Sequence, residues 1–171
     1  EEWNKVTRQG FAFFNDFFGI AYPFGKYDQL AVPDFNSGAM ENVGAVTFAD
    51  QYCCVDGERS LSNKTFFLNS ILHEQAHMWF GNLVTMDWWN DIWLNESFAE
   101  FAGYLAFAGG TDFESPWLEN LWARKLWGYR DDDAISTHTI KFPVENTEYV
   151  MSAIDGITYA KGSAALRQLY Y

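Results

Sequence analysis

The sequence has few cysteines, few cationic residues and no long apolar segment. Its two cysteines, Cys53 and Cys54, are adjacent; such thiols rarely bridge to each other, and they lack the spacing of a structural zinc site. Lysine and arginine number 11 against 23 aspartates and glutamates, and the net charge of −12 argues against a nucleic-acid-binding protein. The acidic surplus suits a cationic ligand, although solubility alone explains it more simply. The sequence contains no run of about 18 apolar residues, which is the length needed to span a membrane.

The chain also lacks the pattern of a signal peptide in its first residues, Glu-Glu-Trp-Asn-Lys. Without a signal peptide or a membrane-spanning segment, a cytoplasmic location is favoured. Residues 159–171 still read as an amphipathic helix where the chain ends. We therefore expect residues 1–171 to be part of a longer protein. The sequence does not predict the compartment or the oligomeric state of that protein.

What the sequence does contain is a large share of apolar and aromatic residues, 49% and 19%, and its 171 residues suffice for one domain with a sizeable core. Apolar spacing and glycine or proline boundaries predict helices over residues 1–18, 62–80, 93–107, 111–129, 147–153 and 159–171. The strand signals predict strands over residues 28–35 and 43–48, with loops at 50–59, 87–91 and 130–145. The expected fold is a single α+β domain, mostly α, in which a small β element precedes a helical body.

The clearest chemistry lies in the segment His73-Glu74-Gln75-Ala76-His77, within the helix predicted over residues 62–80. Residues four apart lie on one helical face, so the two imidazoles can converge on one metal ion. Glu74 lies one step round the helix, where it can reach a water bound to that ion, which is the position of a general base. This is the H-E-x-x-H pattern of zinc hydrolases.

A third metal ligand is expected at Glu96, in the segment Trp93-Leu94-Asn95-Glu96. Catalytic zinc takes three protein ligands and keeps a fourth position for water, and His73, His77 and Glu96 make up that set. The alternative for Glu96 is an exposed helix carboxylate, but its apolar surroundings would make an unpaired charge costly. Glu100, one turn further on, is either a hydrogen-bond partner for the outer nitrogen of His73 or a solvated surface charge, and both readings stay open.

A second candidate segment is Gly38-Ala39-Met40-Glu41-Asn42. Small residues let a backbone approach closely, and an edge strand at this place can pair with an extended peptide. The Glu41 carboxylate could then hold the free α-amine of that peptide through a charge-assisted hydrogen bond. Taken alone the segment is only a turn with an exposed acid, and the zinc-binding pattern is what makes it a candidate for substrate binding.

Other polar and aromatic residues carry weaker signals. His138 is the only histidine outside the metal-binding pattern, and we expect it to be structural rather than a ligand. The three aspartates at residues 131–133 read as a solvated loop, because a calcium site needs more oxygen ligands at defined spacing. The tryptophan-rich stretches 87–93 and 117–127 are expected to pack in the core rather than to stack on a ligand.

Together these segments resemble the zinc aminopeptidases of the aminopeptidase N family, which carry G-A-M-E-N and H-E-x-x-H with a glutamate eighteen residues further on. A third block, Ile157-Thr158-Tyr159-Ala160-Lys161-Gly162, resembles the (I/V)-x-Y-x-K-G segment of that family. Residues 22–28 and 32–35 also look like the family's lead-in to G-A-M-E-N. The resemblance therefore runs from about residue 10 to the end of the chain.

The resemblance implies a thermolysin-like zinc metallopeptidase catalytic domain, with one zinc ion per chain and peptides with a free N-terminus as substrates. It implies that Tyr159 donates a hydrogen bond to the developing oxyanion, whereas from sequence alone Tyr159 is an ordinary aromatic near a helix start. It also places Met40 against the first substrate side chain and Glu41 at its α-amine. Relatives carry an N-terminal β-sheet domain and a C-terminal helical domain; neither lies within residues 1–171, which are expected to be a partial protein.

Three other functions share parts of this pattern. A zinc endopeptidase needs no amine anchor, so Glu41 argues against it, and a leukotriene hydrolase shares the zinc apparatus, but Ala39 favours a plain aminopeptidase. A non-catalytic peptide-binding module commonly loses one of Glu74, Glu96 and Tyr159, which are all present. The preferred N-terminal residue of the substrate is not predicted, because the pocket walls would come partly from the flanking domains.

Overall fold

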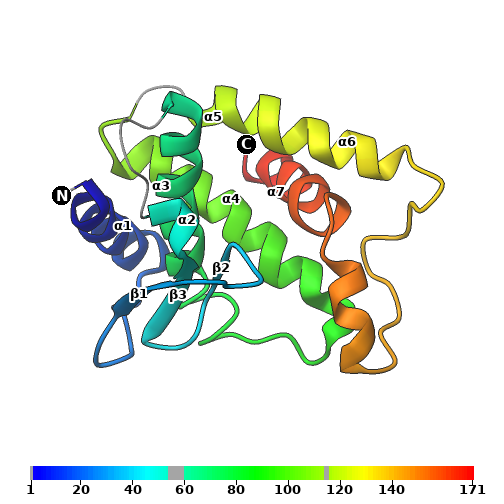
Figure 1. Ribbon diagram of the computed structural model, residues 1–171, viewed down its shortest axis with the longest axis horizontal. Coiled ribbons are helices and arrows are strands. Elements are labelled where there is room, and N and C mark those ends of the chain that lie inside the picture. Colours follow the sequence, from blue (N-terminus) through cyan, green and yellow to red (C-terminus); the bar gives the residue numbers. More distant parts are fainter. Residues whose placement is uncertain (1, 54–59, 114–115) are drawn as a thin grey trace.

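The computed structural model describes residues 2–53, 60–113 and 116–171. Helices make up most of the molecule, and the strands form one small sheet beside them (Figure 1), so the predicted α+β fold that is mostly α is confirmed. In chain order the elements are α1 Glu2–Phe18, β1 Asp28–Val32, β2 Ala39–Met40, β3 Ala45–Ala49, α2 Asp50–Cys53, α3 Leu61–Ala76, η1 Trp89–Asp91, α4 Ile92–Gly110, α5 Pro116–Glu119, η2 Asn120–Lys125, α6 Leu126–Asp132, η3 Thr147–Ala153, η4 Ile157–Lys161 and α7 Gly162–Tyr170. Of the η elements, η1 and η3 are 3₁₀ helices and η2 and η4 are π helices.

The sheet has the strand order β1–β3–β2, so β2 lies at its edge. β1 runs parallel to β3, and β2 runs antiparallel to it. The edge strand expected in 38–42 is present, although only two of its residues pair. β1 ends earlier than the predicted residue 35, because Pro33 and Asp34 form a turn in which Asp34 has a φ of 53°.

Helices α3 and α4 pack directly against each other at the centre of the molecule (Figure 1). Gly103 on α4 permits this approach, since a Cβ there would lie 3.2 Å from the backbone nitrogen of His73. On α3 the predicted packing residues are all buried; they are Phe67, Leu68, Ile71 and Leu72. The H-E-x-x-H segment is therefore pressed between α4 and the main core.

The main core lies between α1, β3, α3 and α4. It is rich in aromatic rings, and Phe14, Phe48 and Trp79 contribute from three different elements. A smaller core of Ile92, Val144, Val150 and Ala153 lies under η3. These two cores hold the ends of α3 and α4 that carry the candidate site.

Two predicted boundaries near the site are wrong. The helix predicted to run to residue 80 ends at Ala76, and the chain then makes successive turns in which Asn82 donates from its backbone nitrogen to the His77 carbonyl at 2.9 Å. The loop predicted at 50–59 begins instead with the short helix α2, while residues 54–59, Cys54 among them, lie outside the described residues. Asp50 directly follows the last residue of β3, so no loop separates β3 from α2.

The helix predicted over 111–129 begins at Pro116 and runs through α5, η2 and α6 to Asp132. Proline suits the first helical position because its fixed φ is already helical and its missing N–H would be unpaired there. The expectation of a core position is wrong for Trp122, which is 68% exposed, and for the half-exposed Trp88, while Trp89 packs against the smaller core. The outer face of this helix is apolar, which the periodicity of the sequence does not distinguish from a buried face.

The C-terminal elements pack across α4 (Figure 1). η3 has the predicted bounds, and the last predicted helix is divided into η4 and α7. Over the described ranges, no helix has both the length and the apolar character needed to cross a bilayer.

Candidate functional site

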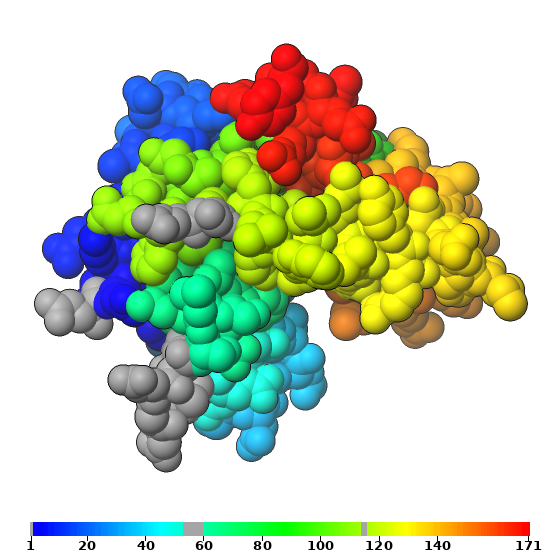
Figure 2. All heavy atoms as spheres, turned by 90° about the horizontal axis from the view of Figure 1, so that it is seen from above, coloured from blue at the N-terminus to red at the C-terminus, as the bar shows by residue number. Residues whose placement is uncertain are grey.

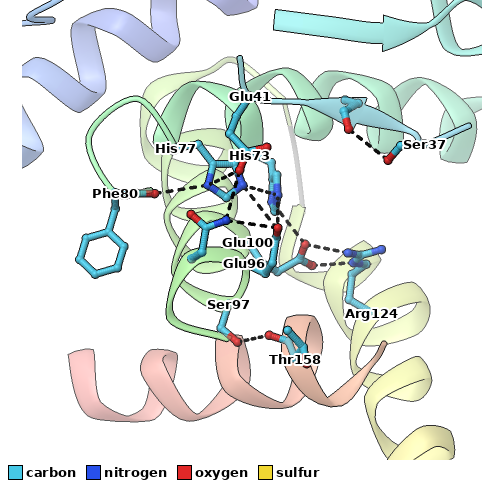
Figure 3. A network of polar contacts seen from close by, with 12 residues as sticks. Ser37, Glu41, His73, His77, Phe80, Glu96, Ser97, Glu100, Arg124 and Thr158 are labelled. Atoms are coloured by element: carbon cyan, nitrogen blue, oxygen red, sulfur yellow. Dashed lines mark hydrogen bonds and ion pairs between the residues drawn. The ribbon is translucent and has the colours of Figure 1, made fainter. Parts of the chain in front are cut away.

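Three side chains meet where the end of α3 faces the start of α4 (Figure 3). The Nε2 atoms of His73 and His77 are 3.0 Å apart. Oε2 of Glu96 lies 3.3 Å from Nε2 of His73 and 3.4 Å from Nε2 of His77. All three residues are buried. The structure therefore brings together the three residues that the sequence predicted to be metal ligands.

The spacing of these atoms fits a metal ion. In a tetrahedral site with bonds of about 2.05 Å to nitrogen and oxygen, neighbouring ligand atoms are about 3.3 Å apart. The three observed separations, 3.0, 3.3 and 3.4 Å, lie around that value. This group could hold a metal ion, and Glu41, Glu74 and His77 form a second set that overlaps it.

The outer nitrogen of His77 is held by the turn that follows α3. Nδ1 of His77 lies 3.3 Å from the carbonyl oxygen of Phe80. A proton on Nδ1 donates to that carbonyl and leaves the Nε2 lone pair free for a metal. Gly81 makes the turn with a φ of 132°, and a Cβ there would lie 2.3 Å from Oδ1 of Asn95 and 3.0 Å from Nδ1 of His77. Only glycine fits this position.

The pKa values of His77 and Glu96 are both strongly shifted by the charges around them. Burial by itself would lower the pKa of His77, but the carboxylates of Glu41 and Glu96 outweigh burial and raise the pKa to about 10. Burial would raise the pKa of Glu96, but the neighbouring imidazoles of His77 and His73 hold that pKa well below its ordinary value. The site thus stabilises an anionic Glu96 beside positive charge, which is the environment a metal cation also supplies.

Glu74 lies beside the three candidate ligands and is buried. Burial raises the pKa of its carboxyl well above the ordinary value, and Glu41 and Glu96 add to this effect while His77 opposes it. Within the described part of the chain, its Oε2 atom is buried without a hydrogen-bond partner. An unpaired buried carboxylate oxygen is costly, so its presence indicates a place for a bound water, ion or substrate.

Glu41 approaches the same point from the edge of the sheet. Its Oε1 atom accepts a hydrogen bond from Nδ2 of Asn95 at 3.2 Å and lies 3.8 Å from Nδ1 of His77. Its backbone carbonyl accepts a hydrogen bond from Nδ2 of Asn82 at 2.8 Å. Both the backbone and the carboxylate of Glu41 are thus tied to the elements that carry the histidines and Glu96.

The other residues of the 38–42 segment have separate positions. Gly38 and Ala39 line the cleft described below, and Met40 is 41% exposed. Asn42 turns toward β3, where its Nδ2 atom donates to Oγ1 of Thr47 at 3.4 Å. The structure therefore brings Gly38, Ala39 and Glu41 to the candidate site, whereas Asn42 shapes the turn that leads into β3.

Tyr159 lies on η4, with its ring nearly parallel to that of His73 at a centroid distance of 5.9 Å. Gly162 lets this segment come close to α4, because a Cβ there would lie 2.0 Å from Oγ of Ser97. Burial raises the pKa of the Tyr159 phenol well above its ordinary value, and the nearby Glu96 carboxylate adds to this. The phenol therefore stays neutral at physiological pH and remains a hydrogen-bond donor.

A cleft of about 260 Å³ opens beside these groups. It is lined by Gly38 and the β2 residue Ala39, by Tyr159 and Arg124 from the C-terminal half, and by His73 and Glu74 of α3. Figure 2 shows the surface hollowed between the cyan segment and the yellow helix. An extended chain in this cleft would run along the open edge of β2.

Comparison with protein families agrees with this geometry. The model of the peptidase family M1 domain matches residues 3–171. The chain belongs to peptidase family M1. The resemblance to the aminopeptidase N family, expected from about residue 10 to the end of the chain, is supported by a match that begins at residue 3.

Named members of family M1 are similar along the same length. The chain is 50% identical over 169 residues to aminopeptidase N of Streptomyces lividans, covering 96% of this chain and 19% of that protein. It is 40% identical to glutamyl aminopeptidase of Bos taurus, covering 96% and 17%, and 42% identical to aminopeptidase N of Mus musculus, covering 96% and 18%. The chain thus spans less than a fifth of the length of these M1 relatives.

Two residues of this M1 site were not predicted from the sequence. Asn95 donates from Nδ2 to Glu41 and, at 3.3 Å, to Oε1 of Glu96, so it joins the edge strand to the candidate ligands. Arg124 forms a bidentate ion pair with Glu100. For Asn95, the sequence offered one signal, a polar residue directly before Glu96 in an otherwise apolar segment. For Arg124, which is 24 residues from Glu100, no local sequence pattern predicts the contact.

Of the two readings for Glu100, the solvated surface charge is wrong, since its side chain is 2% exposed. His138, which we expect to be structural, has its Nε2 atom 2.7 Å from Oδ2 of Asp155. Asp155 in turn accepts from the backbone at the start of η4. The solvated loop predicted at 131–133 is wrong for Asp131 and Asp132, which are on α6, and Asp131 accepts from the Gly156 nitrogen at 2.8 Å; Asp133 lies in the exposed turn that follows. The lone histidine and the aspartates thus hold the segment that carries Tyr159.

Proposed function

We propose that the protein is a zinc-dependent aminopeptidase that hydrolyses the N-terminal residue from peptides, and that residues 1–171 are the catalytic part of it. The observation that carries the proposal is the convergence of His73, His77 and Glu96 at tetrahedral spacing, with Glu74 and Glu41 beside them. The names of the M1 relatives, aminopeptidase N and glutamyl aminopeptidase, support the same reaction.

The three ligands would hold one zinc ion per chain. Two imidazole nitrogens and one carboxylate oxygen are the donor set of catalytic zinc, and the 3.0–3.4 Å spacing fits its bond lengths. When bound, zinc lowers the pKa of a water molecule and polarises a carbonyl group. A dication at this place would also favour the ionised form of Glu74 and so act against the burial that raises its pKa.

Glu74 is the proposed general base and acid. Its unpaired Oε2 atom accepts a proton from the attacking water and then delivers that proton to the nitrogen of the departing peptide. Tyr159 is the proposed oxyanion donor: its phenol stays protonated and donates a hydrogen bond to the carbonyl oxygen as negative charge develops there. Both groups line the cleft together with His73.

Glu41 is the proposed anchor for the free α-amine. Asn95 and Asn82 fix its carboxylate and its backbone, so the ammonium group meets a preorganised acceptor. The backbone of Gly38 and Ala39 would pair with the extended peptide, and Met40 would lie against its first side chain, with Asn42 closing the turn behind them. Requiring the amine makes the reaction exopeptidic.

The test is hydrolysis of amino-acid p-nitroanilides by the full-length protein, beside the same compounds with an acetylated amine. Cleavage of the free-amine compounds alone, lost with a zinc chelator, is the expected result. Glu74→Gln should lower kcat by roughly 10²–10⁴-fold while zinc remains bound. Glu41→Gln should lower kcat/KM by roughly 10–100-fold, the size of a charge-assisted hydrogen bond.

The matched control is Glu145→Gln, which removes an exposed carboxylate outside the site and should leave the rates unchanged. Equal cleavage of the acetylated compounds would remove Glu41 from its role and indicate an endopeptidase. An absence of cleavage by the zinc-loaded wild type would indicate a peptide-binding module instead.

A further inference from the structure

Behind the candidate metal group lies an ion pair that the proposed reaction does not use. Arg124 donates from Nε to Oε1 of Glu100 at 2.6 Å and from Nη2 to Oε2 at 2.8 Å (Figure 3). The side chains of Arg124 and Glu100 are 18% and 2% exposed. A two-point contact between a planar guanidinium and a carboxylate fixes the orientation of both groups, which a single contact cannot do.

Glu100 turns this pair toward the metal ligands. Its Oε2 atom, which accepts from Arg124, lies 3.7 Å from Nδ1 of His73. The opposite ring nitrogen of His73, Nε2, is the one that faces His77 and Glu96. At this distance the two groups are in electrostatic contact without a hydrogen bond, and a carboxylate on this side of a ligating histidine favours the proton on its outer nitrogen. Arg124 is thus connected to His73, a proposed metal ligand, through the side chain of Glu100.

A second route joins Arg124 to the same ring. Its guanidinium lies over the ring of Trp127, 4.8 Å from the centroid, and 5.9 Å from the ring centroid of Tyr159. Tyr159 is stacked on His73. The contacts therefore form a closed circuit from Arg124 through Glu100 to His73, and from His73 through Tyr159 back to Arg124.

The backbone at this place is unusual as well. Arg124 lies in η2, where the helix between α5 and α6 widens into a π turn. Tyr159 lies in η4, which is also a π helix. Inserted π turns shift which side chains face a neighbouring element and occur often at functional sites. Here both π segments supply residues to one wall of the cleft.

We propose that Arg124 is a positioning residue for the reaction, holding His73 through Glu100 and holding the Tyr159 ring by direct contact. This inference rests on the proposed function, since it assigns Arg124 to the same site. It requires that removal of Arg124 weaken zinc binding, slow turnover, or do both, even though the Arg124 side chain neither binds the metal nor transfers a proton.

The experiment compares Arg124→Met with wild type in the full-length protein. Zinc dissociation constants are measured by competition with a chromogenic chelator, and kcat and KM are measured with a free-amine p-nitroanilide. Arg124→Met should lose roughly 10–100-fold in zinc affinity, in kcat at saturating zinc, or in both, with little change in KM. Arg124→Lys should retain more than Arg124→Met but less than wild type, because one ammonium group cannot span both oxygens of Glu100.

Two double-mutant cycles separate the effect of Arg124 through Glu100 from its effect through Tyr159. Adding Arg124→Met to Glu100→Gln should cost little further zinc affinity, because the partner carboxylate is already neutral. Adding Arg124→Met to Tyr159→Phe should cost less in kcat than it does in wild type, because the phenol it positions is gone. Full additivity in both cycles would overturn the proposal.

The matched control is Lys125→Met, which removes a positive charge from the adjacent residue of the same π turn and should stay within about twofold of wild type. If Arg124→Met lowers only the melting temperature and leaves zinc affinity and kcat like those of the control, its role is merely structural and the inference fails. Because zinc affinity is measured without turnover, a wild type that binds zinc but cleaves nothing would overturn the proposed function and still test the route through His73.

Discussion

His77 is a single residue whose charge reports on the whole metal group. Its pKa is raised to about 10 by Glu41 and Glu96, so the metal-free imidazole is protonated at pH 7. A metal ion binds the neutral imidazole, and binding must therefore release that proton. Zinc should release at least one proton at pH 7, and its affinity should rise about tenfold per pH unit until pH approaches the pKa of His77.

Titration calorimetry in buffers of different ionisation enthalpy measures this release. The sign is fixed by the direction of the shift, because a raised pKa keeps the proton on the metal-free form across the neutral range. As a control, His138→Gln removes a histidine outside the group and should leave proton release unchanged. Zinc binding without proton release would contradict the assignment of His77 as a ligand.

Among single residues, the sequence predicted those candidate site residues that lie within one short segment. The structure brings His73, Glu74 and His77 together as their helical spacing predicted, and it brings Glu96, the charge in an otherwise apolar segment, to the same point. Arg124 was missed because its contact with Glu100 joins two helices, and no local pattern encodes such a pair.

Among the elements, the placement of η4 against α4 decides where the Tyr159 phenol lies. Gly162 follows η4 directly, and a Cβ at this position would meet Oγ of Ser97 at 2.0 Å and Cβ of Ser97 at 2.8 Å. Ser97 also donates to the carbonyl of Thr158, so it cannot move away without losing a buried hydrogen bond. Gly162→Ala should cost about 1–3 kcal/mol in stability and lower kcat more than it changes KM.

Denaturant unfolding and p-nitroanilide kinetics check the two effects separately. Gly25→Ala is the matched control, because a Cβ there would meet nothing within 4 Å, and its stability should stay within about 0.5 kcal/mol of wild type. A Gly162→Ala form with wild-type kcat would show that the approach of η4 to α4 does not position Tyr159.

The elements themselves were predicted in type better than in detail. Apolar periodicity identified α1, α3 and α4, because each presents an apolar face to the core, and β3 alternates in the same way. β1 was predicted from its strand signals, although none of its residues is buried. It could not identify the end of α3 at Ala76 or the π turns η2 and η4, since these depend on packing against other elements. Both kinds of error fall beside the candidate site, where local preference and function differ.

For the molecule as a whole, the candidate metal group spans the two central helices. His73 is on α3, His77 is the C-cap of α3, and Glu96 is on α4, so an ion held by all three would couple the helices that carry the main core. Any ligand that binds only the folded state adds to its stability in proportion to the logarithm of concentration over Kd. At a zinc concentration of about 1,000 times Kd, the expected gain is about 4 kcal/mol.

Removing the metal should therefore lower the melting temperature of the full-length protein, and re-adding zinc should restore it. The decisive comparison is with Glu96→Gln, which weakens the site by exchanging a carboxylate for a neutral amide of the same shape. In that variant the response to chelator and to zinc should be strongly reduced, because the third ligand no longer neutralises the ion. If Glu96→Gln responds to chelator as wild type does, the stabilising ion binds elsewhere, and the convergence of α3 and α4 on a metal would lose its support.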